Sequence, residues 1–235
     1  MVRKIRLLLR ENKWLRATAR PFVIWLMNDV LKHKQRLIRK YGYDAVRLIH
    51  EAAHAVDMPY YADCGTLLGF VREKGFIAHD ADMDFSMCPD SGRVRLFYAA
   101  LRERGFEFER FILFDGGLRV FSVRFKEISI DFFQRYLSKD GKFLYVVADK
   151  KDDFWPVFSR PLPRNFKEVV IHGVAVRIPG NSEELLQSMY GDWRTPVVKW
   201  EDAMAPRYDR DYSSHESVVC RSMEDFERFL AENRL

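Results

Sequence analysis

The stretch that decides the fold is GTLLGFVREKGFIAHDADMD, residues 65–84. It begins with a small-residue turn between a predicted short strand at residues 60–63 and a predicted helix at residues 66–74. A tight turn at a helix start exposes backbone N–H groups and the positive end of the helix dipole, which favours an anion such as phosphate. Gly65 and Thr66, whose hydroxyl adds a donor, are therefore the predicted phosphate-binding residues.

The same stretch ends in three aspartates at alternate positions, Asp80, Asp82 and Asp84. If residues 80–87 are extended, all three project to one face, because successive side chains of a strand point to opposite faces. Three carboxylates on one face repel each other, and burying them is costly unless a cation neutralises them. Oxygen ligands of this kind suit Mg²⁺ or Mn²⁺. The pattern indicates a metal site, with a solvated acidic turn as the alternative.

Two further residues extend this interpretation. Asp131 lies in an apolar strand, residues 128–133, where a charge needs a partner, so we predict that it supplies a third carboxylate. Arg72 follows the phosphate turn by about two helical turns and is predicted to contact the same anion, because guanidinium binds phosphate bidentately. The alternative is a surface arginine. Together these residues indicate phosphoryl transfer, in which a bound cation or a carboxylate activates an acceptor hydroxyl.

The rest of the chain predicts an α+β fold. Apolar periodicity and turn residues predict helices at residues 43–58, 93–104, 181–190 and from 222 onward, and strands at residues 82–87, 106–114, 118–125, 127–136 and, as a hairpin, 169–178. Asn181 and Ser222 are predicted helix caps. Such a mixture favours a mixed or mostly antiparallel sheet flanked by helices.

Composition sets the broad class. With 235 residues, of which 48% are hydrophobic and 31% charged, the chain is long enough for one substantial domain with its own core. Its three cysteines are widely spaced and odd in number, so we expect a reducing compartment without disulfides or a zinc site. We find no apolar run of about 18 residues and no convincing signal peptide. These features favour a cytoplasmic protein.

Basic residues are concentrated in residues 1–40, where few acids balance them. Leucines and tryptophans interleave with these bases, which is typical of an interfacial helix on an anionic membrane, and we expect peripheral attachment at the inner face of the plasma membrane. The alternative is a solvated basic helix that packs on the domain. No nucleic-acid motif is present, so no nucleic-acid partner is expected. We predict a basic amphipathic extension at 1–42, a catalytic domain at 43–200, and a C-terminal loop and helix at 201–235 that pack on it.

The motifs taken together resemble the LicD/fukutin family. Residues 65–84 resemble its signature, in which a GTLLG turn, an arginine, a Gly-Phe-Ile and an aspartate-rich strand recur. Residues 130–132 resemble its second acidic strand, and HGVAVRIPGNSEELLQSMYGDW, residues 172–193, resembles its closing stretch. The resemblance covers roughly residues 43–195.

This resemblance implies a fold similar to polymerase-β-like nucleotidyltransferases and the transfer of a phospho-alcohol, such as phosphocholine, from a CDP-linked donor onto a cell-surface glycan with release of CMP. Together with the residue pattern, the resemblance implies that Asp82 and Asp84 bind a metal and that Asp131 is a third ligand or a base. It also implies that Gly65, Thr66 and Arg72 bind the donor phosphates. Two alternatives remain open: nucleotidyl transfer by the same fold, and an inactive scaffold that binds membrane and nucleotide.

One departure from the family pattern lies beside the metal pair. The family usually has Trp-Asp-Asp-Asp where this chain has His79-Asp80-Ala81-Asp82. Ala81 falls on the strand face opposite Asp82, so the metal pair is predicted to be intact. Asp80 and His79 are assigned to the donor side of the site. As an alternative, His79 only packs or caps the loop.

Overall fold

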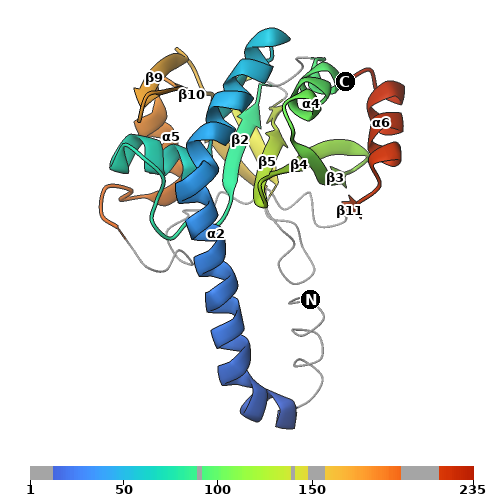
Figure 1. The fold of residues 1–235 in the computed structure, drawn as a ribbon. Helices are drawn as coiled ribbons and strands as arrows, with labels where there is room; N and C mark the ends of the chain where they lie inside the picture. Colours follow the sequence, from blue (N-terminus) through green and yellow to red (C-terminus); the bar gives the residue numbers. More distant parts are fainter. Residues whose placement is uncertain (1–12, 89–91, 139–140, 148–156, 197–216) are drawn as a thin grey trace.

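The computed structural model describes residues 13–88, 92–138, 141–147, 157–196 and 217–235. Parts of the predicted N-terminal extension and C-terminal segment therefore lie outside the described residues. Helices pack around a six-stranded sheet, and two smaller sheets lie beside it. The α+β prediction is confirmed (Figure 1).

Helix α2 (Lys13–Ala55) is the longest element, at 43 residues. Its C-terminal part packs against the domain, where apolar residues at helical spacing are buried, namely Ile38, Ala45, Val46, Ile49, Ala52 and Ala53. Its N-terminal part projects beyond the sheet (Figure 1). The predicted boundary between residues 42 and 43 thus falls inside one continuous helix. Extension and domain share this helix because a single run of helical hydrogen bonds crosses the boundary.

The main sheet has the order β1-β2-β5-β4-β3-β11. Its strands are β1 (Tyr60–Ala62), β2 (Met83–Met87), β3 (Glu107–Phe114), β4 (Gly117–Phe125), β5 (Ile128–Gln134) and β11 (Ser217–Cys220). Neighbours are antiparallel except β2 and β5, which are parallel, so the predicted mixed, mostly antiparallel sheet is confirmed. The β3–β4 hairpin turns through Asp115 and Gly116, which both have positive φ, as a tight primed turn requires.

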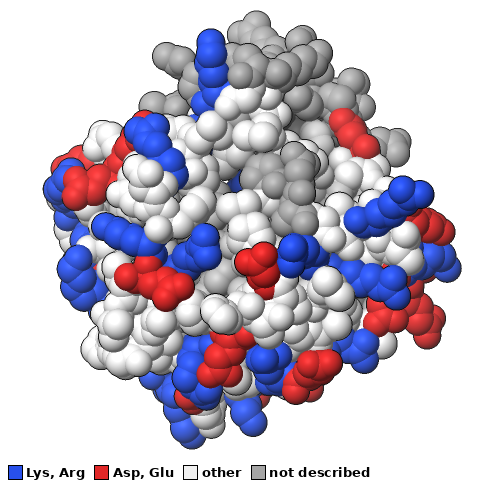
Figure 2. All heavy atoms as spheres, turned by 90° about the horizontal axis from the view of Figure 1, so that it is seen from above, with Lys and Arg blue, Asp and Glu red and all other residues white. Residues whose placement is uncertain are grey.

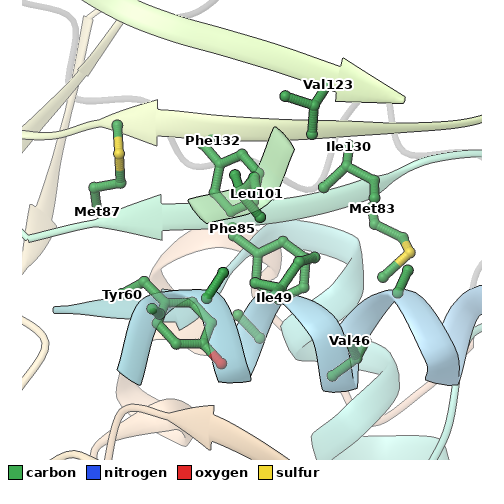
Figure 3. Close-up of a cluster of buried hydrophobic side chains, with 14 of the residues drawn as sticks. Val46, Ile49, Tyr60, Met83, Phe85, Met87, Leu101, Val123, Ile130 and Phe132 are labelled. Atoms are coloured by element: carbon green, nitrogen blue, oxygen red, sulfur yellow. The ribbon is translucent and has the colours of Figure 1, made fainter. Parts of the chain in front are cut away.

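One face of the sheet holds the core. Val46 and Ile49 of α2 face Met83 and Phe85 of β2 in Figure 3, with Phe132 of β5 beside them. Each fully buried side chain of this size contributes about 1.5–3 kcal/mol to folding. Helices α4 (Val94–Glu103) and α6 (Met223–Glu232) cover the sheet next to α2. Because side chains alternate along a strand, packing Met83 and Phe85 here commits the residue between them to the opposite face.

The predicted helix at residues 66–74 is real but is built from two pieces. The α-helix α3 (Cys64–Leu68) continues into a π-helical turn, η1 (Gly69–Glu73), and Lys74 ends it in the left-handed conformation. A Cβ on Gly69 would lie 2.5 Å from the Gly75 carbonyl oxygen, so the chain needs a glycine there. The π-helical turn therefore brings Gly75, which follows η1, into contact with Gly69 at its start.

Smaller elements surround the sheet. Strands β9 (Lys167–Ile171) and β10 (Val174–Ile178) form the predicted hairpin, and β6 (Tyr136–Leu137), β7 (Phe143–Val147) and β8 (Val157–Pro161) form a third sheet. Helix α5 (Ser182–Tyr190) follows β10. The predicted side-chain cap by Asn181 is wrong, because its side chain accepts from Arg164 N and donates to Leu162 O instead.

The C-terminal residues are part of the main sheet as well as of its cover. Strand β11 pairs with β3, and Ser222 caps α6 by accepting a hydrogen bond from Asp225 N at 3.1 Å, as predicted. Cys64, Cys88 and Cys220 are free thiols. Seen from above, acidic and basic side chains are interspersed over this face (Figure 2). Among the described residues, no helix is long and apolar enough to cross a membrane.

Candidate active site

A row of polar residues crosses four strands on the sheet face opposite the core. Arg110 of β3 is the register partner of Ser122 of β4, Ser122 is the partner of Asp131 of β5, and Asp131 is the partner of Asp84 of β2. Neighbouring strands lie about 4.8 Å apart, so Asp84 and Asp131 are side by side. The sheet register therefore brings together two carboxylates that are far apart in the sequence.

Burial and like charge raise the pKa values of this acidic cluster. At Asp84, burial is the largest cause, Asp82 and Asp131 add to it, and the pKa lies well above its ordinary value. Burial and the charge of Asp82 raise the pKa of Asp80 to about 6. Negative charge gathered in this way is costly unless a proton or a cation neutralises it.

Arg110 is a site residue that the sequence interpretation missed. Its Nη2 lies 3.1 and 3.3 Å from the two carboxylate oxygens of Asp131. Burial raises the pKa of Asp131, and Arg110 opposes that rise. Only the strand register identifies it, because Arg110, Ser122 and Asp131 align only once the pairing of β3, β4 and β5 is known.

Asp80 reaches the site by a different route from the one predicted. Strand β2 begins at Met83, so residues 80–82 are not extended strand, and the predicted alternation places neither Asp80 nor Asp82, which is exposed. Instead its carboxylate lies over Gly65, where an added Cβ would be 3.0 and 3.2 Å from the two oxygens. The loop is held against α2 by a hydrogen bond of 3.1 Å from Gln35 Nε2 to the carbonyl oxygen of His79, whose side chain is exposed.

Thr66 connects the turn to the aspartates. Its Oγ1 accepts a hydrogen bond from the backbone N–H of Asp84 at 2.9 Å, and the residue is only 1% exposed. The hydroxyl therefore fixes the backbone of β2 at the position that carries a site carboxylate. This contact joins Thr66 of the predicted phosphate turn to Asp84 of the predicted metal pair.

Arg72 has partners on the C-terminal side of the domain. Its Nη1 donates to the carbonyl oxygen of Trp193 at 3.1 Å, and its Nε donates to Glu73 at 2.8 Å. The side chain is 13% exposed. Arg72 thus ties η1 to the chain after α5, and its Nη2, which neither of these bonds uses, is a donor left for a phosphate.

A second charged cluster lies under the turn and was also missed. Asp63, at the end of β1, is buried with Arg135 and Arg160 as ion-pair partners. These residues come from the chain between β1 and α3, the chain after β5, and β8, so nothing in the local sequence pattern brings them together. The buried charge of Asp63 at a strand end was the available signal.

The chemistry of the donor set fits a hard divalent cation. Asp82, Asp84 and Asp131 offer carboxylate oxygens, which Mg²⁺ and Mn²⁺ prefer. Within the described part of the chain, no three acidic, histidine or cysteine side chains already form a finished metal site. The Asp131 carboxylate is paired with Arg110 instead, so a third contact requires Arg110 to share it.

Comparison with known families decides the classification. Residues 57–181, which include the turn, the aspartates and Asp131, match the family described as "LicD/FKTN/FKRP, nucleotidyltransferase domain". The chain belongs to the LicD family. The matched nucleotidyltransferase domain agrees with the predicted fold. The same match shows that the chain is a transferase with a phospho-transfer or nucleotidyltransferase role.

Solved structures similar to this LicD-family chain include two of the antibiotic-resistance factor ANT(2'')-Ia. The crystal structure with adenylyl-2''-tobramycin has 18% identity and a TM-score of 0.41, and covers 68% of this chain and 80% of the other. The solution structure has 18% identity and a TM-score of 0.41, and covers 70% and 78%. No curated protein matches the sequence.

Proposed function

We propose that this protein is a metal-dependent transferase that moves a phospho-alcohol from a CDP-linked donor to a hydroxyl group of a cell-surface glycan and releases CMP. The observation that carries the proposal is the register pairing of Asp84 with Asp131, next to Gly65 and Thr66 in the first turn of α3. Family membership supplies the reaction class. The CDP-linked donor, the glycan acceptor and the bound metal are proposed here in addition to that reaction class.

In this proposal, Asp82 and Asp84 hold Mg²⁺ or Mn²⁺, with Asp131 as third ligand or base. When bound, the cation neutralises phosphate charge and polarises the P–O bonds. The backbone N–H groups near Gly65 and the charge of nearby arginines orient the donor phosphates. Thr66 contributes by fixing Asp84.

The transfer step forms one bond and breaks one bond. The acceptor hydroxyl oxygen attacks the phosphorus that carries the alcohol, the bond from that phosphorus to the CMP oxygen breaks, and CMP leaves with the electron pair. Asp131 takes the hydroxyl proton if it acts as base, because it lies in the same row of the sheet as Asp84 and within reach of Arg110, which holds its orientation.

Nucleotidyl transfer is a second candidate, favoured by the description of the matched domain. In that reaction the acceptor attacks the phosphorus of the nucleotide itself, and a nucleotide remains on the product. Product mass separates the two: we expect an added phospho-alcohol, whereas an added nucleotide would replace the leading proposal by the second.

The donor is identified by a screen of CDP-choline, CDP-ribitol, CDP-glycerol and CMP-aminoethylphosphonate, with CMP release as the readout. We expect one donor to give metal-dependent release that is lost in Asp82→Asn. An exposed carboxylate outside the row, Asp44→Asn in α2, is the matched control. Undiminished release by Asp82→Asn contradicts the metal assignment. No release with any donor favours the inactive scaffold.

A further inference from the structure

The buried cluster under the Gly65 turn contains one carboxylate and two guanidinium groups. Arg135 Nη2 contacts Asp63 Oδ2, and Arg160 Nη1 lies 3.5 Å from Asp63 Oδ1. All three side chains are largely enclosed, with 5% of Asp63, 4% of Arg135 and 11% of Arg160 exposed. Buried charge of this kind is tolerated only when each group is matched.

Asp63 and Arg135 match each other. Ser86 Oγ donates to Asp63 Oδ2 at 2.6 Å, and Arg135 Nε donates to Ser86 Oγ at 2.8 Å, which closes a triangle around that oxygen. The other oxygen, Oδ1, accepts from the N–H of Cys64 at 2.8 Å. Burial alone would raise the pKa of Asp63, but Arg135 and Arg160 hold it below its ordinary value.

Arg160 is therefore left with a surplus positive charge. Its separation of 3.5 Å from Asp63 Oδ1 is longer than a good charged hydrogen bond, which measures about 2.7–2.9 Å. Within the described residues it has no second acidic partner. A guanidinium with most of its surface removed from water and no carboxylate of its own favours an anionic ligand.

The surroundings of Arg160 belong to the candidate active site. Helix α5 packs against both β8, which carries Arg160, and α3, which carries the turn. Tyr190 of α5 has a pKa raised mainly by burial, with Cys64 adding to the rise and Arg160 opposing it. The charge of Asp84 also raises the pKa of Tyr190. Because Arg160 Nη1 lies 3.5 Å from Asp63, which caps the N-terminus of α3, the guanidinium lies beside the start of that helix.

We propose that Arg160 binds the diphosphate of the donor, with Asp63 and Arg135 as the residues that position it. This inference rests on the proposed function, because it assigns a donor residue to that same site. A diphosphate placed between the aspartate row and Arg160 is neutralised from two sides. The fork of the guanidinium matches phosphate oxygens that a single ammonium cannot match.

The test compares Arg160→Gln and Arg160→Lys with a matched control, Arg164→Gln, an exposed arginine four residues away that pairs with Glu184. We measure binding of inorganic pyrophosphate and of CDP with Mg²⁺ by calorimetry, then KM for donor and acceptor, and the melting temperature. Loss of charged hydrogen bonds weakens binding on the order of 10- to 100-fold. We expect this loss in Arg160→Gln, a smaller one in Arg160→Lys, and none in the control.

Stability separates a ligand residue from a structural one. Because Arg135 already matches Asp63, Arg160→Gln should melt close to the wild type, whereas Arg135→Gln leaves a buried carboxylate unpaired and should melt well below it. Unchanged affinity for pyrophosphate and CDP in Arg160→Gln overturns the inference. Unfolding of both Arg160 variants also overturns it, because it makes Arg160 structural.

The outcomes also distinguish this inference from the proposed function. Weaker pyrophosphate binding in Arg160→Gln, without CMP release from any CDP-linked donor by the wild type, supports the inference and contradicts the function. If the wild type turns over a donor and Arg160→Gln keeps full affinity for pyrophosphate and CDP, the function is supported and the inference is contradicted. A wild type that binds neither pyrophosphate nor CDP contradicts both.

Discussion

Asp84 and Asp131 are direct register partners across the parallel pair of β2 and β5, and both are largely buried. Two carboxylates in this relationship repel each other, and among the residues that the structure describes only Asp131 has an arginine, Arg110, paired with it. A fold selected for stability alone gains nothing from this arrangement. We therefore interpret the pair as a functional feature that destabilises the protein when no cation is bound.

The first prediction concerns this destabilisation. Asp84→Asn should raise the free energy of unfolding by about 1 kcal/mol in EDTA at neutral pH, because it removes one of the repelling charges. Asp131→Asn should not stabilise, since it leaves Arg110 without its carboxylate. Urea unfolding of the three proteins checks this. An Asp84→Asn protein that unfolds at lower urea than the wild type contradicts it.

A second prediction concerns Thr66. Thr66→Val leaves the Asp84 N–H without its partner in a buried position and should cost about 1–3 kcal/mol of stability and most of the activity. Thr66→Ser keeps the hydroxyl and should lose less of both. Thermal melts and CMP release measure the difference, and equal losses in the two variants would show that the hydrogen bond is unimportant.

The third prediction concerns acid. The pKa of Asp63 is lower in the folded protein than in the unfolded chain, so its ionised form contributes stability above the unfolded pKa, about 3.9. This contribution is lost as the pH falls below that value toward the folded pKa. The difference in unfolding free energy between the wild type and Asp63→Asn should therefore shrink as the pH is lowered from about 5 to about 2. A constant difference over this range contradicts the assignment.

The fourth prediction concerns the basic N-terminus. Deleting residues 1–27 should abolish binding to vesicles that contain anionic lipid and leave binding to neutral vesicles unchanged, because the bases supply the attraction. The deletion stops short of Ile38, which is buried in the core, and of Gln35, which holds the loop at His79. Cosedimentation measures the effect. Equal binding by both proteins would instead favour a helix that is merely solvated.

Much of the fold was predictable because local signals agreed with it. Apolar periodicity placed α4, and the adjacent glycines of the turn Asp115-Gly116-Gly117 placed the β3–β4 hairpin, although positive φ falls on Asp115 and Gly116. The strand that carries Asp84 was predicted as well, but it begins at Met83, so the alternation expected from residue 80 does not hold. The length of α2 did not follow, because the basic extension at residues 1–42 and the helix at residues 43–58 were predicted as separate elements, whereas one continuous helix joins them.

The grouping of the candidate site residues could be predicted where they belong to one contiguous motif, but not where it depends on strand register. Gly65, Thr66 and Asp84 belong to one contiguous motif, and one hydrogen bond joins Thr66 to Asp84. Arg110 and Arg160 come from β3 and β8, and their positions depend on strand pairing that no local pattern specifies. Long-range register is decided by the whole sheet.

Release of CMP from CDP-linked donors by the purified protein tests the central claim most directly. With Mg²⁺ present, we expect at least one donor to yield CMP and a product heavier by the phospho-alcohol, and we expect EDTA or Asp82→Asn to stop both. Turnover that is unaffected by EDTA and by Asp82→Asn, or a product that carries the nucleotide, would contradict the account.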